Sequence, residues 1–191
     1  MSARFIVFLN YLSLFIKLRM KTLKYLLVGF VFAGAFLTSS HAASDFDGHW
    51  KFDPEMSTAL DPWSTMSITI DAQGDEVSIV RKFGGDKRNA SEAMILDMTL
   101  PTQVVEVEGW WDNRHIGAYL GGDKQQTVEA KWLDEGRTLQ LNINMILETA
   151  QGESQVRVLR EMRLSRDGQT LRVLQIRSSR NLPIVRVFRK Q

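Results

Sequence analysis

The stretch Phe46–Lys51, FDGHWK, decides the fold of this chain, because a long series of strand-like segments starts there. Downstream of it, apolar and polar residues alternate between turn signals, and little of the chain repeats its apolar residues at the spacing of a helix. Met66, Ile68 and Ile70, for example, alternate with polar residues before the turn Ala72–Asp75. This pattern predicts an all-β domain.

The same rhythm predicts about ten short strands. Turn signals separate them, among them Asp134–Gly136 and the Asp-Gly pair at 167–168, which is typical of a tight hairpin. Asp53–Thr65 is the one longer segment expected to lie outside the strands. The strands expected after the first one cover Met66–Asp71, Glu76–Phe83, Ala93–Leu100, Val104–Trp111, His115–Leu120, Val128–Leu133, Leu139–Met145, Ser154–Arg163, Thr170–Ser178 and Pro183–Lys190.

The connections between these strands are mostly about two to five residues long, which favours antiparallel pairing in sequence order. A sheet of this size generally closes on itself, because closure removes the edges that would pair with other chains. We therefore expect an up-and-down antiparallel β-barrel of about eight to ten strands. A β-sandwich is the main alternative.

Residues 1–42 are interpreted as a leader that contains a signal peptide. Lys21 and Lys24 supply its positive start and Tyr25–Thr38 its apolar centre, while small residues predict cleavage after Ala42. The apolar centre has 14 residues, fewer than the roughly 20 that cross a bilayer as a helix, which favours cleavage over a retained membrane span. We expect contact with the membrane only through the leader, before cleavage.

The domain that remains, residues 43–191, is expected to be exported to the periplasm or secreted. A second apolar run upstream of Met20 makes the leader long for one signal, so a translation start at Met20 is the alternative to a start at Met1. The absence of cysteine excludes disulfides, thiolate metal sites and a catalytic cysteine. The domain must therefore be stabilised by packing, which its length allows.

The basic character of the whole chain belongs largely to the leader. The leader holds five Lys and Arg residues and no acid, which leaves the domain with 19 basic and 22 acidic residues. This balance argues against nucleic acid as a partner. Residues 151–191, however, carry ten basic residues and three acidic ones. This surplus indicates either an anion-binding wall or a solvated strand face paired with acidic neighbours.

The two ends of the domain carry a family resemblance. Phe46–Lys51 resembles the F-x-G-x-W-K opening of the calycin group, which includes lipocalins and fatty-acid-binding proteins, and Val185–Lys190 is similar to the closing strand of that group. The resemblance implies that Trp50 plugs one end of a lipocalin-like barrel and that Arg186 or Arg189 lies over its ring as a cation–π partner.

The resemblance is incomplete at the last strand. The fatty-acid-binding proteins use an R-x-Y pair there to bind a carboxylate, whereas this chain keeps Arg186 and has Phe188 in place of the tyrosine. The segment between the first two strands is also too short for their two-helix lid. Lipocalins are therefore the better comparison within the group.

The densest local chemistry lies in Gly109–His115. If Asp112 and Asn113 form a two-residue hairpin turn, Trp111 faces Arg114 and Trp110 faces His115 across it. These four side chains are predicted to form the rim of a ligand pocket. The alternative is that one tryptophan fills the core and the other covers the outside of the sheet.

Arg160 is the other candidate ligand contact. It shares the alternation of Val158 and Met162, which places it on the inward face, where an unpaired charge would be costly. It would then need an acid, water or an anionic ligand. A bulge that turns Arg160 outward is the alternative.

Catalytic signatures are absent from the sequence. The domain has two histidines, His49 and His115, with no metal-ligand spacing around them, and it has no nucleophile elbow, phosphate loop or evident pair of carboxylates. No catalytic residue, metal or cofactor is predicted, and the oligomeric state stays open.

Three functions are compatible with these observations. The first is an exported lipocalin-like domain that binds a small, mostly apolar or amphipathic molecule in the barrel, with an anionic end near Arg160 or Arg186. The second is a filled barrel that acts as a protein-interaction or envelope-assembly module. The third is an isomerase or cyclase in the barrel mouth, built around Asp112 and His115.

Overall fold

Eleven strands form one antiparallel sheet in the computed structural model, which describes residues 45–60, 63–86, 89–107, 119–120, 124–179 and 181–191. The leader lies outside the described residues. The strands are β1 (Gly48–Asp53), β2 (Thr65–Gln73), β3 (Glu76–Gly84), β4 (Asn89–Asp97), β5 (Gln103–Glu106), β6 (Tyr119–Leu120), β7 (Gln125–Leu133), β8 (Thr138–Thr149), β9 (Gly152–Leu164), β10 (Thr170–Arg177) and β11 (Ile184–Lys190).

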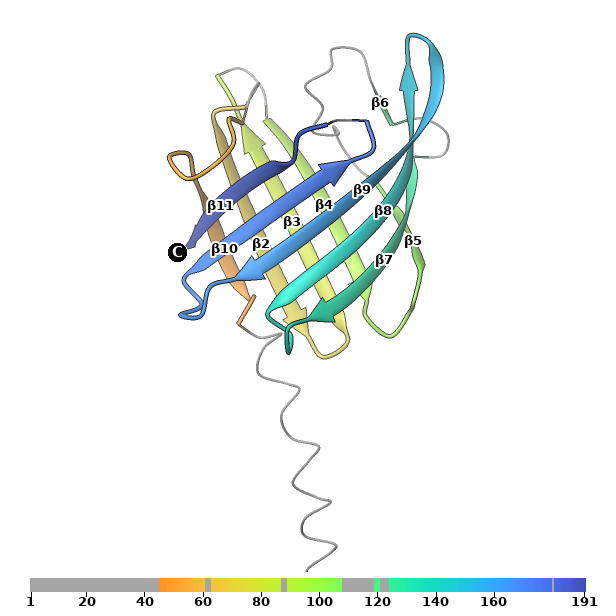
Figure 1. Ribbon diagram of the computed structural model, residues 1–191. Helices are drawn as coiled ribbons and strands as arrows, with labels where there is room; N and C mark the ends of the chain where they lie inside the picture. The colour runs from red at the N-terminus through yellow and green to blue at the C-terminus, as the bar shows by residue number, and fades with distance from the viewer. Residues whose placement is uncertain (1–44, 61–62, 87–88, 108–118, 121–123, 180) are drawn as a thin grey trace, which may run out of the picture. The chain divides into compact units, whose positions relative to one another are not determined.

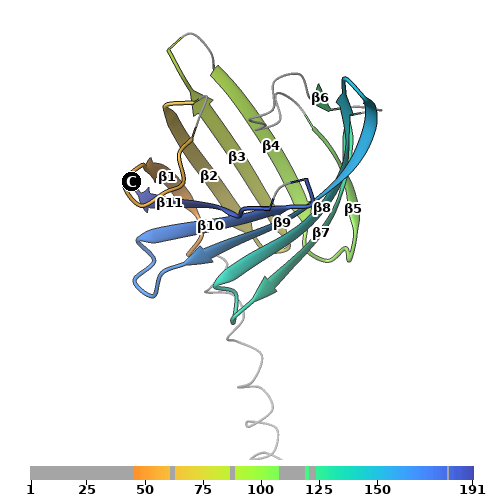
Figure 2. The same ribbon diagram turned by 45° about the horizontal axis from the view of Figure 1, so that its top comes forward.

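Ten of the strands follow one another in a continuous ladder, in the order β4-β3-β2-β1-β11-β10-β9-β8-β7-β5, and β6 pairs with β8 beside this path. Figures 1 and 2 show β2–β4 and β7–β10 as two facing walls, joined where β1 lies against β11. The result is a nearly closed up-and-down barrel. The predicted barrel is thus confirmed in this form, and the alternative of two stacked sheets is excluded.

The ladder is interrupted between β4 and β5, the two ends of the path. Within the described residues, the side chain of Gln103 spans this seam at the end of β4: its Oε1 accepts from the backbone N–H of Asp97 at 2.9 Å, and its Nε2 donates to the Asp97 carbonyl at 3.1 Å. A side-chain amide therefore supplies one donor and one acceptor where two backbones would otherwise pair.

β4 runs over different residues from those predicted. The expected strand Ala93–Leu100 instead covers Asn89–Asp97. The carboxylate of Asp97 accepts hydrogen bonds from the backbone N–H and the hydroxyl of Thr99, which turns the chain before Pro101. The same two donors lower the pKa of Asp97, because they stabilise its charged form.

The next two expected strands are shorter where the structure describes them. β5 ends at Glu106, and β6 covers Tyr119–Leu120. Residues 108–111 and 115–118 of the two expected strands are not among the described residues, so that part of each strand stays a prediction. The residues between Val107 and Tyr119 lie outside the described part of the chain. The described residues between Asp53 and Thr65 form no strand, as predicted.

The turns that join β2 to β3 and β9 to β10 form at the residues that the sequence predicts. Gly74 and Gly168 have φ of +60° and +67°, conformations that glycine adopts without strain. The side chain of Asp167 accepts from the hydroxyl of Ser165 and from the backbone N–H of Gln169. The Ser165 hydroxyl, and then the Gln169 N–H, lower the pKa of Asp167 by stabilising its carboxylate.

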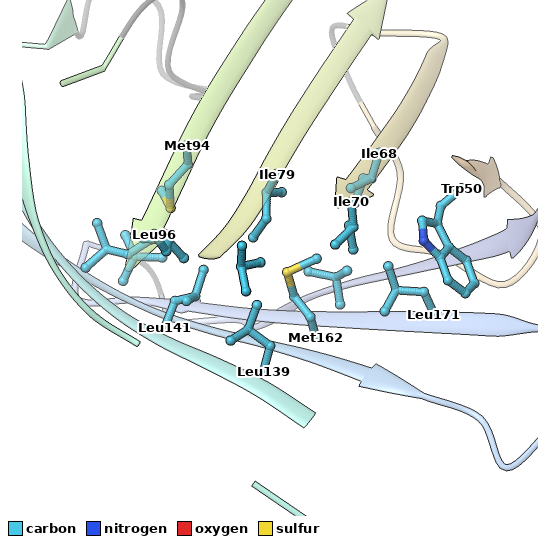
Figure 3. Close-up of a cluster of buried hydrophobic side chains, with 14 of the residues drawn as sticks. Trp50, Ile68, Ile70, Ile79, Met94, Leu96, Leu139, Leu141, Met162 and Leu171 are labelled. Carbon is cyan, nitrogen blue, oxygen red and sulfur yellow. The ribbon is translucent and has the colours of Figure 1, made fainter. Parts of the chain in front are cut away.

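The core lies between the facing walls, because alternate residues of each strand point inward. Figure 3 shows Ile68, Ile79 and Met94 on one wall and Leu141 and Met162 on the other, directed toward each other. Part of this core is fully or almost fully buried, and we call this part the apolar floor; it consists of Trp50, Ile70, Ile79, Met94, Leu96, Leu139, Leu141, Met162 and Leu171. Over the described ranges, no helix is long and apolar enough to cross a membrane.

Candidate functional site

Six of the eight buried polar side chains among the described residues lie between apolar residues on β3, β4 and β9–β11. Each of them is at most 6% exposed. Their strand neighbours at positions i±2, such as Ile79, Met94, Met162 and Val173, belong to the core. We call this set the interior ionic cluster; it consists of Arg81 on β3, Glu92 on β4, Arg160 on β9, Gln175 and Arg177 on β10, and Arg186 on β11.

Glu92 links the two walls of the barrel. It lies directly opposite Arg81 in the β3–β4 ladder, and Arg81 Nη2 donates to Glu92 Oε2. The other carboxylate oxygen, Oε1, lies 3.7 Å from Nη2 of Arg160 on the facing wall. Arg160 is therefore inward, as its alternation predicts, and one buried carboxylate serves two guanidinium groups.

Three arginines surround Gln175 on the inner face. Arg160 is directly opposite on β9, Arg177 is the next inward residue of β10, and Arg186 lies diagonally across on β11, opposite Val173. Opposite and diagonal neighbours in a ladder lie within reach of side chains as long as arginine. With its amide oxygen turned toward Arg177, Gln175 accepts from Nε at 2.6 Å and from Nη2 at 2.5 Å.

The cluster carries a surplus of positive charge. Among the residues that the structure describes, the buried charged side chains are four arginines and Glu92. Arginine stays protonated at any ordinary pH. Each of the four makes further interactions, so hydrogen bonding alone does not define the site. The site is instead defined by the imbalance of charge among the described buried residues, because charge of one sign in a low-dielectric interior attracts the opposite sign strongly.

The cluster has a fixed position relative to the apolar floor. On β3 and β4, the pairs Val77–Leu96 and Ile79–Met94 lie between the Arg81–Glu92 pair and the hairpin turn that joins β2 to β3. On β9 and β10, two apolar pairs likewise separate the Arg160–Gln175 pair from the turn at 165–169. On these strands the interior is thus apolar between the ionic cluster and the turns, and Phe83 and Val158, the next inward residues on the other side of the cluster, are again buried and apolar.

The end of the barrel at Trp50 differs from the prediction in its cation. Lys190 is directly opposite Trp50, and its Nζ lies 5.2 Å from the centre of the ring. Arg189 is opposite Lys51, on the other face, where its Nε donates to Asp53 at 3.1 Å. Arg186 is buried in the interior ionic cluster. The predicted guanidinium over Trp50 is therefore wrong, and an ammonium occupies the place.

The structure does not describe the remaining predicted ligand contacts. Trp110, Trp111, Arg114 and His115 lie outside the described residues, so their predicted place at the rim of a pocket stays a prediction. His49 is exposed on the outer face, where Nδ1 lies 2.9 Å from the hydroxyl of Thr69. No group of three or more metal-ligating side chains occurs in the described ranges.

Two open hollows lie elsewhere on the barrel wall, with volumes of about 620 and 590 Å³. Most of the side chains around them project outward, such as Lys51 and Ser67 at the first and Asn142 and Arg157 at the second. Their linings contain no buried charged residue. Among the described residues, the buried charged side chains therefore all belong to the interior ionic cluster and none to these hollows.

Sequence reasoning found Arg160 and Arg186 but missed Arg81, Glu92 and Arg177. Glu92 could have been found, because it shares its alternation with Ala90, Met94 and Leu96. No protein-family model, curated protein or solved structure matches this chain.

Proposed function

We propose that this protein is an exported, lipocalin-like barrel that binds a small amphipathic anion in its interior. The apolar body of the ligand packs toward the apolar floor, and its anionic end lies at the interior ionic cluster. The observation that carries the proposal is the buried charge: four arginines against a single glutamate among the described residues. An anion at this position would offset that surplus.

The layered interior supports a ligand with two chemically different ends. Apolar pairs line β3–β4 and β9–β10 on the side of the hairpin turns, and the ionic pairs follow directly. A neutral apolar ligand would make no use of the buried guanidinium groups. A small, fully polar anion would make no use of the apolar floor. An amphipathic anion matches both layers.

The barrel and its ends support the comparison with lipocalins. The FDGHWK motif opens β1, and the first strand pairs with the last one, as in a closed calycin barrel. The proposed export rests on the sequence of residues 1–42 alone. The rim residues Trp110, Trp111, Arg114 and His115 remain the proposed entrance contacts.

Displacement of the fluorescent anion 1-anilinonaphthalene-8-sulfonate by dodecanoate tests this function on the full-length chain. Arg160→Met should weaken dodecanoate binding by about tenfold or more, because it removes a charged hydrogen-bond donor from a buried site. Arg163→Met is the matched control: it lies on the same strand, faces outward and has a side chain that is 67% exposed. The affinity of this variant for dodecanoate should stay within about twofold of the affinity of the unaltered protein.

Equal loss in both variants would show that binding depends on surface charge and would overturn the interior site. If dodecanoate displaces none of the bound fluorescent anion, the filled barrel that acts through its surface is favoured instead.

A further inference from the structure

The outer face of β1–β4 carries a candidate site of its own, separate from the interior ionic cluster. We propose that this face binds an acidic polysaccharide, a linear sugar chain whose carboxylate or sulfate groups alternate with neutral hydroxyls. The site is the open hollow of about 620 Å³, and its side chains come from all four strands. These strands are consecutive neighbours in the sheet, as Figures 1 and 2 show.

Cations and hydroxyls alternate along one row of this face. Lys51 on β1 lies directly opposite Ser67 on β2. Ser67 in turn lies opposite Lys82 on β3, and Lys82 lies opposite Ser91 on β4. Neighbouring strands are about 4.8 Å apart, so the backbones of the two lysines are about 10 Å from each other, with a hydroxyl between them. This order suits a polymer in which charged and neutral groups follow one another.

Among the described residues, the charged side chains that line the hollow are all basic. Its other polar side chains are those of His49, Thr65 and Asn89. Asp53, two residues beyond Lys51 on β1, accepts from Nε of Arg189 at 3.1 Å. Arg189 also lies directly opposite Lys51, and like charges in such positions repel each other. An anionic group bound at Lys51 would offset this repulsion.

A glycine keeps one end of the hollow open. Gly84 lies opposite Thr65 on β2 and opposite Asn89 on β4. A Cβ atom at Gly84 would lie 2.5 Å from Oγ1 of Thr65 and 3.5 Å from Oδ1 of Asn89. The bare backbone therefore leaves room for a hydroxyl and an amide at the same place. Both groups can donate to and accept from the hydroxyls of a sugar.

The hollow lacks the apolar groups that a membrane or a protein partner would use. None of the exposed large apolar side chains in the described part of the chain lines it. Met66 and Phe83, which border it, are buried in the core. Membrane-binding surfaces insert apolar side chains into the bilayer, and the centre of a protein interface is enriched in aromatic residues. Ammonium, hydroxyl and amide groups around an open hollow favour a sugar chain instead.

Biolayer interferometry of the full-length protein on immobilised alginate oligosaccharides tests the inference, because each sugar of alginate carries one carboxylate. The protein should bind alginate but not uncharged dextran. Binding should be lost at about 0.5 M salt, which screens exposed charges. The double variant Lys51→Met/Lys82→Met should bind alginate about fivefold to tenfold more weakly, because it removes two exposed ion pairs with the ligand. Both lysines are exposed, so the fold should persist.

Lys131→Met is the matched control, because Lys131 is also an exposed strand lysine but lies on β7, outside the hollow. The affinity of this variant for alginate should stay within about twofold of that of the unaltered protein. The double variant Ser67→Ala/Ser91→Ala tests recognition of the sugar itself. It should weaken binding of alginate about threefold, through lost hydrogen bonds, and leave the weaker binding of polyglutamate unchanged.

Three results would overturn the inference. Alginate binding that persists in the lysine double variant would show that the hollow is not the site. Polyglutamate that binds as tightly as alginate of equal charge would indicate an acidic peptide as the partner. If the unaltered protein binds phosphatidylglycerol vesicles through the two lysines but does not bind alginate, the partner is a membrane surface. Binding of dodecanoate should be unchanged in the lysine double variant, so these results do not depend on the proposed function.

Discussion

Replacement of Glu92 by glutamine should destabilise the barrel strongly, because this carboxylate is the only buried acid among the described residues. The side chains of Arg81, Glu92 and Arg160 are 4 to 7% exposed. At a separation near 4 Å, opposite charges attract by about 4 kcal/mol with an effective dielectric constant of about 20. The glutamine removes this attraction and leaves both guanidinium groups desolvated. We expect a loss of about 3 to 5 kcal/mol in the free energy of unfolding.

Urea unfolding followed by tryptophan fluorescence measures this loss, and thermal unfolding provides a second measure. For a domain of this size, the melting temperature should fall by about 10 °C. Glu129→Gln is the matched control, because Glu129 is an exposed strand residue on β7. Its replacement should change the unfolding free energy by less than about 0.5 kcal/mol.

The same variant should bind anions more tightly, because it adds to the positive surplus of the cluster. Loss of stability together with gain of affinity is the signature that separates a compensated ionic cluster from ordinary packing. A change in unfolding free energy below about 1 kcal/mol would refute the reasoning, since two desolvated arginines cannot lose their shared carboxylate at so small a cost.

Three further outcomes are expected. Gln103→Ala should open the seam at Asp97, with a loss of about 1 to 2 kcal/mol and faster hydrogen exchange at the end of β4; unchanged exchange would contradict its role. Lys190→Met should lower the unfolding free energy by about 0.5 to 1 kcal/mol through its cation–π contact with Trp50, and a loss well above 2 kcal/mol in urea unfolding would show a larger role. The pKa values of Asp97 and Asp167 lie below the usual 3.8 in the folded state, so their contribution to stability is complete above that pH and is lost as the pH falls through the lowered values. Carbon NMR titration of the two carboxyl groups would contradict this if either group titrates at its ordinary pKa.

The strands were predictable because one buried face imposes a period of two on the sequence. Leu139–Met145 and Ser154–Arg163 show the clearest alternation, and both lie within strands of the structure, β8 and β9. The end of β4 was missed because Met98 and Leu100 continue the alternation, while the Asp97 side chain ends the strand through a local turn. The periodicity of apolar residues does not predict the hydrogen bonds between Asp97 and Thr99.

The site was predictable only where one face of a strand is polar. Arg160 stands out because Arg157, Glu161 and Arg163 mark the outer face of β9. On β10, Leu174 and Ile176 are apolar on the outer face, so the alternation does not say whether Gln175 and Arg177 point inward. The partnership of Glu92 with Arg160 joins opposite walls, and no local pattern in the sequence encodes it. The cation over Trp50 was missed for a similar reason, since a shift of one residue in register exchanges Arg189 for Lys190.

The pairing of β1 with β11 constrains how the chain can fold during synthesis. Trp50 belongs to the first strand of the sheet, whereas its ladder partner Lys190 belongs to the last strand. Until β11 has been synthesised, β1 lacks its neighbour on one side, and the inner surfaces of the earlier strands remain exposed to water. A nascent chain in this state presents an unpaired strand edge that can pair with other chains. Removal of β11 should therefore yield an aggregated product rather than a smaller folded domain.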